Sequence, residues 1–142
     1  MYYVNREQIE RRLDVIPELL QVFTLANTNP GEHLLARYAE ERALHLAIEI
    51  VTDVGSYLID GFIMRDASSY EDIVDIMVDE QVVDKELGNL LTQLVRLRRP
   101  LVQEYFDWDR SGGHELVQQL DEGLTSFANK VRNYIDKEVI PS

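Results

Sequence analysis

A wide apolar pattern runs through ALHLAIEIVTDVGSYLIDGF, the stretch from Ala43 to Phe62. Its apolar residues recur at three- and four-residue steps, which is the spacing of one face of an α-helix. These residues are Ala43, Leu46, Ala47, Ile50, Val51, Val54, Leu58 and Phe62. Because a face of this width has to be covered by other elements, the stretch predicts a long helix inside a helical bundle.

A line of polar residues follows the opposite face of the same predicted helix. It consists of Arg42, His45, Glu49, Asp53, Ser56 and Asp60. Charged residues at this spacing usually keep a helix surface in water, and we interpret most of the line in this way. The alternative is that a part of the line faces a cleft.

The helical period covers most of the remaining chain on the amino-terminal side. A first helix is predicted after Asn5, with Gln8 as its capping-box partner and a kink at Pro17. Its apolar face consists of Ile9, Leu13, Ile16, Leu20 and Phe23. The turn-forming residues from Asn27 to Gly31 predict a loop before the long helix.

Three further helices are predicted on the carboxyl-terminal side. Ser69 and Asp72 indicate the start of a short helix. Leucines keep the helical period from Leu87 to Leu101, but Pro100 predicts a kink or a break near Arg99. The last helix carries Leu116, Leu120, Leu124, Phe127, Val131 and Ile135. We therefore predict an all-α fold, an antiparallel up-and-down bundle of about four long helices and one short helix.

Length and composition limit the classes of function. The 142 residues suit one domain, residues 1–142, with a single core. The net charge of −12 argues against a broad surface for nucleic acid or anionic lipid, so we expect neither DNA nor a membrane as a partner. The chain has no cysteine and no apolar run of membrane-spanning length, and we expect it to be cytoplasmic.

The sequence carries no motif for a metal or a cofactor. His33, His45 and His114 are its only imidazoles, and none has the partner spacing of a helical metal site. Carboxylate pairs such as Glu49 and Asp53 arise by chance in so acidic a chain. There is also no glycine-rich phosphate loop. We therefore predict no metal and no cofactor.

A basic cluster stands out against this acidic background. Arg96, Arg98 and Arg99 fall within four residues, immediately before Pro100. Guanidinium groups bind phosphate oxygens in pairs, so we predict a phosphate site at Arg98 and Arg99. The alternative is that these arginines pair with carboxylates of neighbouring helices.

Three stretches of the chain resemble the HEPN superfamily, in its HepT-like branch and most closely its YutE-like members. They are Asp60–Asp66, Ser69–Ile73 and Leu101–Tyr105. The resemblance implies a metal-independent endoribonuclease, the toxin of a toxin–antitoxin pair whose antitoxin is a minimal nucleotidyltransferase. It also implies a homodimer in which two copies of the family motif face each other across a cleft.

The family motif is an Arg, four residues, a His, one residue and a Tyr. Arg98 and Tyr105 fit it, but Gln103 stands at the position of the His. The resemblance implies that the arginine neutralises the scissile phosphate while the histidine transfers a proton, which a glutamine amide cannot do. It also implies that Tyr105 accepts an AMP group from the antitoxin; the alternative is that Tyr105 is a core aromatic residue.

Gln103 leaves three hypotheses open. In the first, His45 supplies the proton transfer and the ribonuclease activity is retained. In the second, the arginines bind a nucleotide or RNA in a dimer that does not catalyse. In the third, only the fold is retained, Arg98 pairs with Glu49 or Asp53, and the dimer is a scaffold for protein interactions.

Overall fold

The computed structural model describes residues 3–28 and 33–139, and the regular structure within these ranges is entirely helical. The α-helices are α1 (Arg6–Leu13), α2 (Ile16–Ala26), α3 (His33–Gly61), α4 (Tyr70–Asp79), α5 (Lys85–Arg96) and α6 (Val117–Glu138). The predicted all-α bundle is confirmed. The last three residues of the predicted loop before α3, Asn29 to Gly31, lie outside the described residues.

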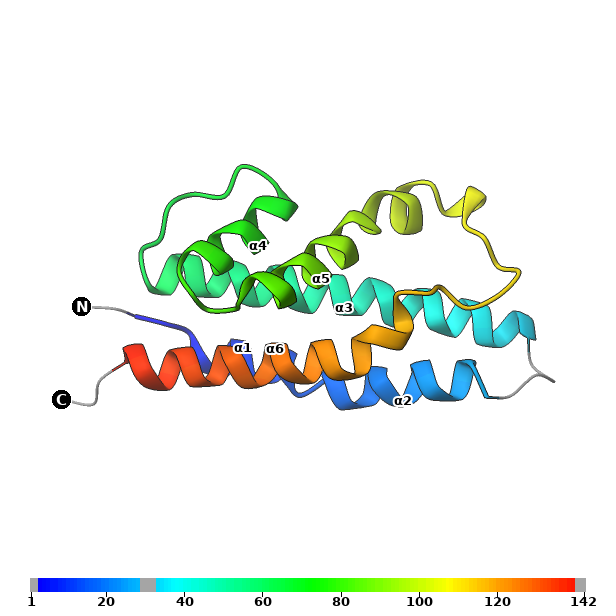
Figure 1. Ribbon diagram of the computed structural model, residues 1–142, viewed down its shortest axis with the longest axis horizontal. Coiled ribbons are helices and arrows are strands. Elements are labelled where there is room, and N and C mark those ends of the chain that lie inside the picture. Colours follow the sequence, from blue (N-terminus) through cyan, green and yellow to red (C-terminus); the bar gives the residue numbers. More distant parts are fainter. Residues whose placement is uncertain (1–2, 29–32, 140–142) are drawn as a thin grey trace.

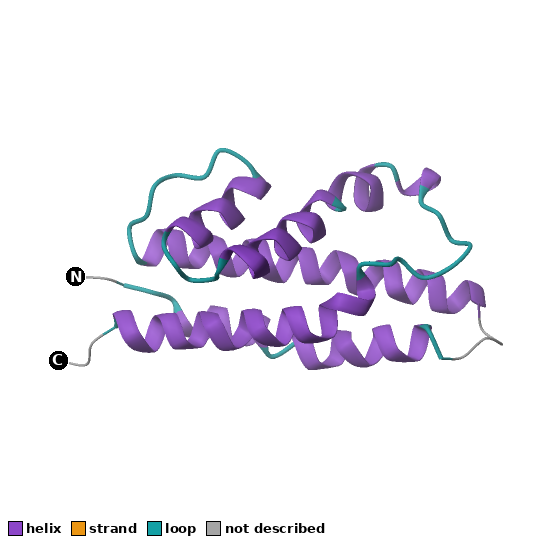
Figure 2. Cartoon of the chain, viewed as in Figure 1, coloured by secondary structure: helices purple, strands orange, loops and turns teal. Residues whose placement is uncertain are grey.

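Helix α3 is the centre of the bundle. It contacts α1 and α2 along one side and α4 and α5 along another, while α6 packs against α2 and α5 (Figures 1 and 2). The apolar face predicted for α3 is buried, apart from a partly exposed Leu46. Among the helices of the described segments, none is both long and apolar enough to cross a membrane.

The first predicted helix is two helices, and the kink predicted at Pro17 is a break. Asn5 caps α1 by accepting a hydrogen bond from the Gln8 backbone N–H at 3.3 Å, as its position predicts. Helix α1 ends at Leu13, and Pro17 lies in the first turn of α2. Because Pro17 has no N–H to donate to the carbonyl four residues earlier, the α-helical hydrogen bonds stop before Pro17.

The connection between α3 and α4 ends one helix and caps the next. Ile63 follows α3 with a φ of 55°, in the left-handed region, and the Met64 N–H donates to the Ile59 carbonyl at 2.9 Å. Ser69 caps α4, as predicted, by accepting from the Asp72 backbone N–H at 3.0 Å. The loop therefore sets where the first turn of α4 lies.

Helix α4 packs very close to α3. A Cβ atom at Gly55 of α3 would lie 2.3 Å from Cγ2 of Ile73 and 3.3 Å from Cε of Met77, both on α4. Only glycine leaves room for this approach. The close packing holds α4, and with it Tyr70 at its first position, against the middle of the bundle.

Candidate functional site

The break predicted at Pro100 is confirmed. Helix α5 ends at Arg96, and a π turn (η2, Arg99–Gln103) follows with Pro100 in its first turn. Pro100 has no N–H to donate to the Arg96 carbonyl, as an α-helix would require. The Glu104 N–H instead donates to the Arg99 carbonyl at 2.9 Å, a step of five residues.

This π turn changes which side chains lie near one another. In an α-helix, two residues five apart point about 140° away from each other. In a π turn the hydrogen bond itself spans five residues, so that residues at this spacing approach one face. The turn therefore brings Arg98 and Gln103 toward the same side. The side chain of Gln103 is exposed and hydrogen-bonds none of the described residues.

Arg98 lies on the ring of Tyr70. Its guanidinium carbon is 4.3 Å from the ring centroid, which is a cation–π contact. The Nε atom of Arg98 is buried without a hydrogen-bond partner. In the part of the chain that the structure describes, no carboxylate oxygen lies within 4.0 Å of the guanidinium nitrogens. Arg98 is thus held by an aromatic ring and has no carboxylate partner among the described residues.

The carboxylates proposed as partners of Arg98 are engaged elsewhere. Asp53 accepts a hydrogen bond from Nε of Arg12 at 3.0 Å. Glu49 lies 3.4 Å from Nε2 of His45, one turn earlier on α3. The ion pair between Arg98 and Glu49 or Asp53, expected under the third hypothesis, is not formed.

His45, the tentative proton-transfer residue, belongs to a separate pair of contacts. Its Nε2 faces Glu49, and its Nδ1 lies 3.3 Å from a terminal nitrogen of Arg42. It has no hydrogen bond or ion pair with Arg98, Gln103 or any other described residue of the motif. The structure therefore does not bring His45 together with the motif.

The other two arginines of the basic cluster do pair with carboxylates. Nε of Arg96 contacts Glu71 on α4, and Nε of Arg99 lies 3.5 Å from the carboxylate of Glu104. Both pairs are largely exposed, and pairs of this kind contribute little to stability. The pairing with a neighbouring helix therefore applies to Arg96, whereas Arg99 pairs with the residue that ends its own turn. Arg98 has no carboxylate partner among the described residues.

Tyr105 lies on the surface, so its interpretation as a core aromatic residue is wrong. It opens a 3₁₀ turn (η3, Tyr105–Asp107) and is 60% exposed. Phe106, beside it, is 69% exposed, and the two rings meet edge to face at 5.6 Å. The helical spacing of the preceding leucines fails to predict this position because the π turn ends the α-helical period first.

Arg110 joins this turn to α3. It donates twice to the carboxylate of Glu41, both times at 2.7 Å, and once to the Tyr105 carbonyl at 3.0 Å. The bonds to Glu41 raise the pKa of the guanidinium. The guanidinium carbon of Arg110 also lies 4.6 Å from the ring centroid of Tyr38, a residue that is 52% exposed. Arg110 thus links the exposed ring of Tyr38 to the turn that carries Tyr105 and Phe106, and we call these three exposed residues the aromatic surface.

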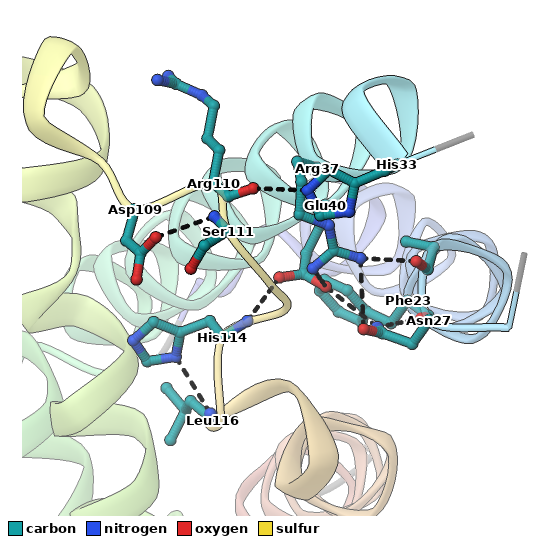
Figure 3. A network of polar contacts seen from close by, with 11 residues as sticks. Phe23, Asn27, His33, Arg37, Glu40, Asp109, Arg110, Ser111, His114 and Leu116 are labelled. Atoms are coloured by element: carbon teal, nitrogen blue, oxygen red, sulfur yellow. Dashed lines mark hydrogen bonds and ion pairs between the residues drawn. The ribbon is translucent and has the colours of Figure 1, made fainter. Parts of the chain in front are cut away.

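A buried polar network holds the loop between η3 and α6 (Figure 3). Arg37 and Glu40 of α3 are 6% and 2% exposed, and their side chains lie 3.5 Å apart. Glu40 accepts from the His114 backbone N–H at 2.8 Å and from the Asn27 amide at 3.0 Å. Arg37 donates to the Ala26 carbonyl at 2.6 Å. We call Asn27, Arg37, Glu40 and His114 the buried anchor, after its buried pair Arg37 and Glu40; Asn27 is exposed and His114 is half-buried.

The sequence contains no signal for the buried anchor. Arg37 and Glu40 are three residues apart, which is typical of a solvated helix surface. A Cβ at Gly113 would lie 2.4 Å from Oδ1 of Asn27 and 2.8 Å from a terminal nitrogen of Arg37, so a larger residue there would displace these side chains. The end of α2, helix α3 and the loop before α6 meet only in the folded chain, so the periodicity of one helix cannot reveal this network.

An acidic hollow lies beside the π turn. This open hollow of about 410 Å³ lies between the turn and the following loop. Its lining includes Glu104, Asp107, Asp109 and Glu115. Such a lining repels phosphate, so this hollow does not suit an anion. In the described ranges, no three His, Asp or Glu side chains gather as metal ligands.

Polar contacts fix the first turn of α4, which carries Tyr70. Asp72 accepts two hydrogen bonds from the guanidinium of Arg65, at 2.7 and 2.9 Å, and one from the Ser68 backbone N–H at 2.9 Å. These bonds, from Arg65 above all, hold the pKa of Asp72 well below its usual range. These contacts therefore join the loop before α4 to the first turn of the helix.

Comparison with known proteins identifies the family. The model of the family described as Ribonuclease HepT-like matches residues 9–131. YutE of Bacillus subtilis (strain 168), which is provisionally named an RNase, is 38% identical over 141 residues, covering 99% of this chain and 96% of YutE. The likeness to YutE-like proteins that three short stretches indicate thus extends over the whole chain.

Solved structures agree with this assignment. The structure of YutE, a cytosolic protein of Bacillus subtilis, matches with a TM-score of 0.90 at 37% identity and covers 100% of this chain and 98% of its own. A tri-AMPylated HEPN toxin of Shewanella oneidensis, in complex with an MNT antitoxin, matches with a TM-score of 0.74 at 14% identity. That match covers 88% of this chain and 96% of the toxin, and it shows the shared HEPN fold. The chain belongs to the HepT-like ribonuclease family.

Proposed function

We propose that this protein is a HepT-like endoribonuclease that binds RNA at Arg98 and whose cleavage step is impaired by Gln103. One observation carries the proposal: the Arg98 guanidinium is held on the Tyr70 ring, has no carboxylate partner among the described residues, and lies one π turn before the exposed Gln103. A guanidinium in this state is suited to a phosphate oxygen.

The impairment follows from proton chemistry. RNA cleavage without a metal needs a proton removed from the ribose 2′-hydroxyl and one delivered to the leaving oxygen. Arg98 stabilises the charge on the phosphate, but Gln103 does not titrate near neutral pH. His45 contacts Arg42 and Glu49 and has no hydrogen bond or ion pair with the described motif residues, so the proposal does not assign it the missing role.

A homodimer is part of the proposal. Family motifs act in pairs across a dimer cleft, and this chain has an exposed aromatic surface of Tyr38, Tyr105 and Phe106 beside the motif. Exposed aromatic residues that lie together are typical of protein interfaces. A monomeric mass in solution at micromolar concentration would contradict the dimer.

A minimal nucleotidyltransferase antitoxin is the partner that the proposal includes. The Shewanella oneidensis HEPN toxin is AMPylated and bound to an MNT antitoxin. Tyr105 is the matching acceptor here: its side chain is exposed, and its ring contacts Phe106. An AMP group on this hydroxyl would add bulk and negative charge near the arginines and would oppose the binding of RNA.

The test compares the parent protein with Arg98→Ala and Gln103→His, each incubated with cellular RNA in the presence of a chelator. We expect weak cleavage by the parent, none by Arg98→Ala, and stronger cleavage by Gln103→His, because an imidazole restores proton transfer. Unchanged cleavage by Arg98→Ala would show that the activity comes from elsewhere.

A non-catalytic scaffold is the second candidate, and the exposed aromatic surface is the observation that favours it. In that case RNA would not bind to the parent, and Gln103→His would remain inert. The dimer would persist, since a scaffold needs the interface and not the arginine.

A further inference from the structure

The contact between Arg98 and Tyr70 joins two separate elements. Arg98 lies between α5 and the π turn, whereas Tyr70 is the first residue of α4. The ring centroid is 4.3 Å from the guanidinium carbon, a distance at which the ring face attracts a cation. We infer that Tyr70 is a positioning residue that holds the Arg98 guanidinium in place for an RNA phosphate.

The inference rests on the proposed function, and it adds a residue from outside the family motif. The aromatic face takes the place that a carboxylate would otherwise take beside Arg98. A carboxylate would neutralise the cation, whereas a ring holds it and leaves its charge available. The terminal nitrogens of Arg98 donate to none of the described residues, so they can still receive a phosphate.

Burial of one nitrogen strengthens the argument. Nε of Arg98 is buried and has no hydrogen-bond partner, which is unfavourable in itself. An arginine side chain that is held in one conformation also loses rotamer entropy, which favours a move into the solvent. The ring contact offsets this cost and keeps the guanidinium where it is.

Tyr70 is itself held firmly. Ser69 caps the helix that begins at Tyr70, and Asp72 is bound by Arg65 and Ser68. The ring is 47% exposed, so neighbouring side chains leave room for a ligand beside it. These contacts do not involve Arg98, so the backbone position of Tyr70 does not depend on the arginine.

The experiment uses the full-length protein and follows two readouts. The first is the NMR resonance of the Arg98 Nε–H, assigned by its loss in Arg98→Ala. The second is the affinity for a fluorescently labelled single-stranded RNA of mixed sequence. The variants are Tyr70→Phe, which keeps the ring, and Tyr70→Leu, which keeps an apolar side chain without a ring. Tyr57→Ala is the matched control, because it removes another cation–π pair, with Arg12 at 5.0 Å.

We expect the Nε–H resonance to carry a ring-current shift in the parent, Tyr70→Phe and Tyr57→Ala, and to lose it in Tyr70→Leu. RNA affinity should fall about three- to tenfold in Tyr70→Leu and stay within twofold of the parent in the other two variants. Rescue by phenylalanine separates a role of the ring from a role of the hydroxyl.

Two results would overturn the inference: an Arg98 resonance that does not respond to Tyr70→Leu, or equal RNA affinity of Tyr70→Leu and Tyr70→Phe. Failure of the proposed function looks different. In that case the parent binds no RNA at all, while the ring-current shift still depends on Tyr70.

Discussion

Arg37 and Arg98 are the two arginines whose Nε is buried without a hydrogen-bond partner in the described chain, and they differ in what surrounds the rest of the guanidinium. Arg37 faces the Glu40 carboxylate and donates to the Ala26 carbonyl, and both charged side chains are almost fully buried. Arg98 has only an aromatic ring. The guanidinium of Arg37 is therefore engaged in holding the fold, whereas the guanidinium of Arg98 keeps its charge available for a ligand.

The largest expected effect concerns the buried anchor. Glu40→Ala should lower the free energy of unfolding by about 3–5 kcal/mol, because it leaves the Arg37 charge buried and unpaired. It also removes the acceptor for the Asn27 amide and the His114 N–H. Urea unfolding followed by circular dichroism, at one fixed protein concentration, measures the loss.

The matched control for this prediction is Glu104→Ala. Glu104 also pairs with an arginine, Arg99, but both side chains are largely exposed. Its loss should change the free energy of unfolding by less than about 1 kcal/mol. Equal losses in the two variants would show that the buried anchor is no more important to the fold than a surface pair.

The next effect depends on pH and concerns the turn that carries Tyr70. The folded-state pKa of Asp72 is depressed, chiefly by the hydrogen bonds from Arg65, so its ionised form stabilises the fold. This stabilisation is complete above the unfolded-state pKa, near pH 4, and is lost as pH falls through the folded-state pKa. Asp72→Asn should therefore melt several degrees below the parent at pH 7, as recorded by thermal unfolding.

The difference in melting temperature should shrink as the pH is lowered below about 4, because Asp72 of the unfolded parent chain then binds a proton that the folded protein does not yet bind. Asp75→Asn is the control, because Asp75 is an exposed carboxylate on the same helix. It should melt close to the parent at every pH. A gap between Asp72→Asn and the parent that stays constant with pH would mean that the charge of Asp72 is not the cause.

A smaller effect, of opposite sign, is expected at Ile63. Its left-handed backbone disfavours a β-branched residue, and its side chain is 76% exposed, so little burial is lost on replacement. Ile63→Asn should raise the free energy of unfolding by about 1 kcal/mol, because asparagine tolerates this conformation. Chemical unfolding measures the gain.

Leu25→Asn is the control for the backbone argument. Leu25 is 66% exposed but lies in the regular α2, where asparagine is a poorer helix former than leucine. The free energy of unfolding of Leu25→Asn should be lower than that of the parent by roughly 0.5 kcal/mol. A similar loss in Ile63→Asn would refute the strain at Ile63.

The smallest effect on stability should come from Arg98→Ala. The variant loses a cation–π contact but also removes an unpaired buried nitrogen, and the two changes oppose each other. We expect a change in the free energy of unfolding within about 0.5 kcal/mol. Arg37→Ala, by comparison, should be as costly as Glu40→Ala. Equal losses of unfolding free energy in Arg98→Ala and Arg37→Ala would contradict the view that Arg37 stabilises the fold and Arg98 does not.

Local signals in the sequence predicted much of the fold. The apolar period of α3, the caps at Asn5 and Ser69 and the break at Pro100 are all confirmed. These features depend on neighbouring residues along one element, so their physics is contained in a short stretch. The kink expected at Pro17 is instead a break, because the missing N–H interrupts the hydrogen bonds of the helix.

The sequence by itself therefore determined the helices, the family and the motif positions Arg98, Gln103 and Tyr105. Only the tertiary structure decided that Arg98 rests on Tyr70, that Tyr105 lies on the surface, and that Glu40 is buried with Arg37. The reason is that helix period and capping are local, whereas the partner of a side chain is set by which other element packs against it.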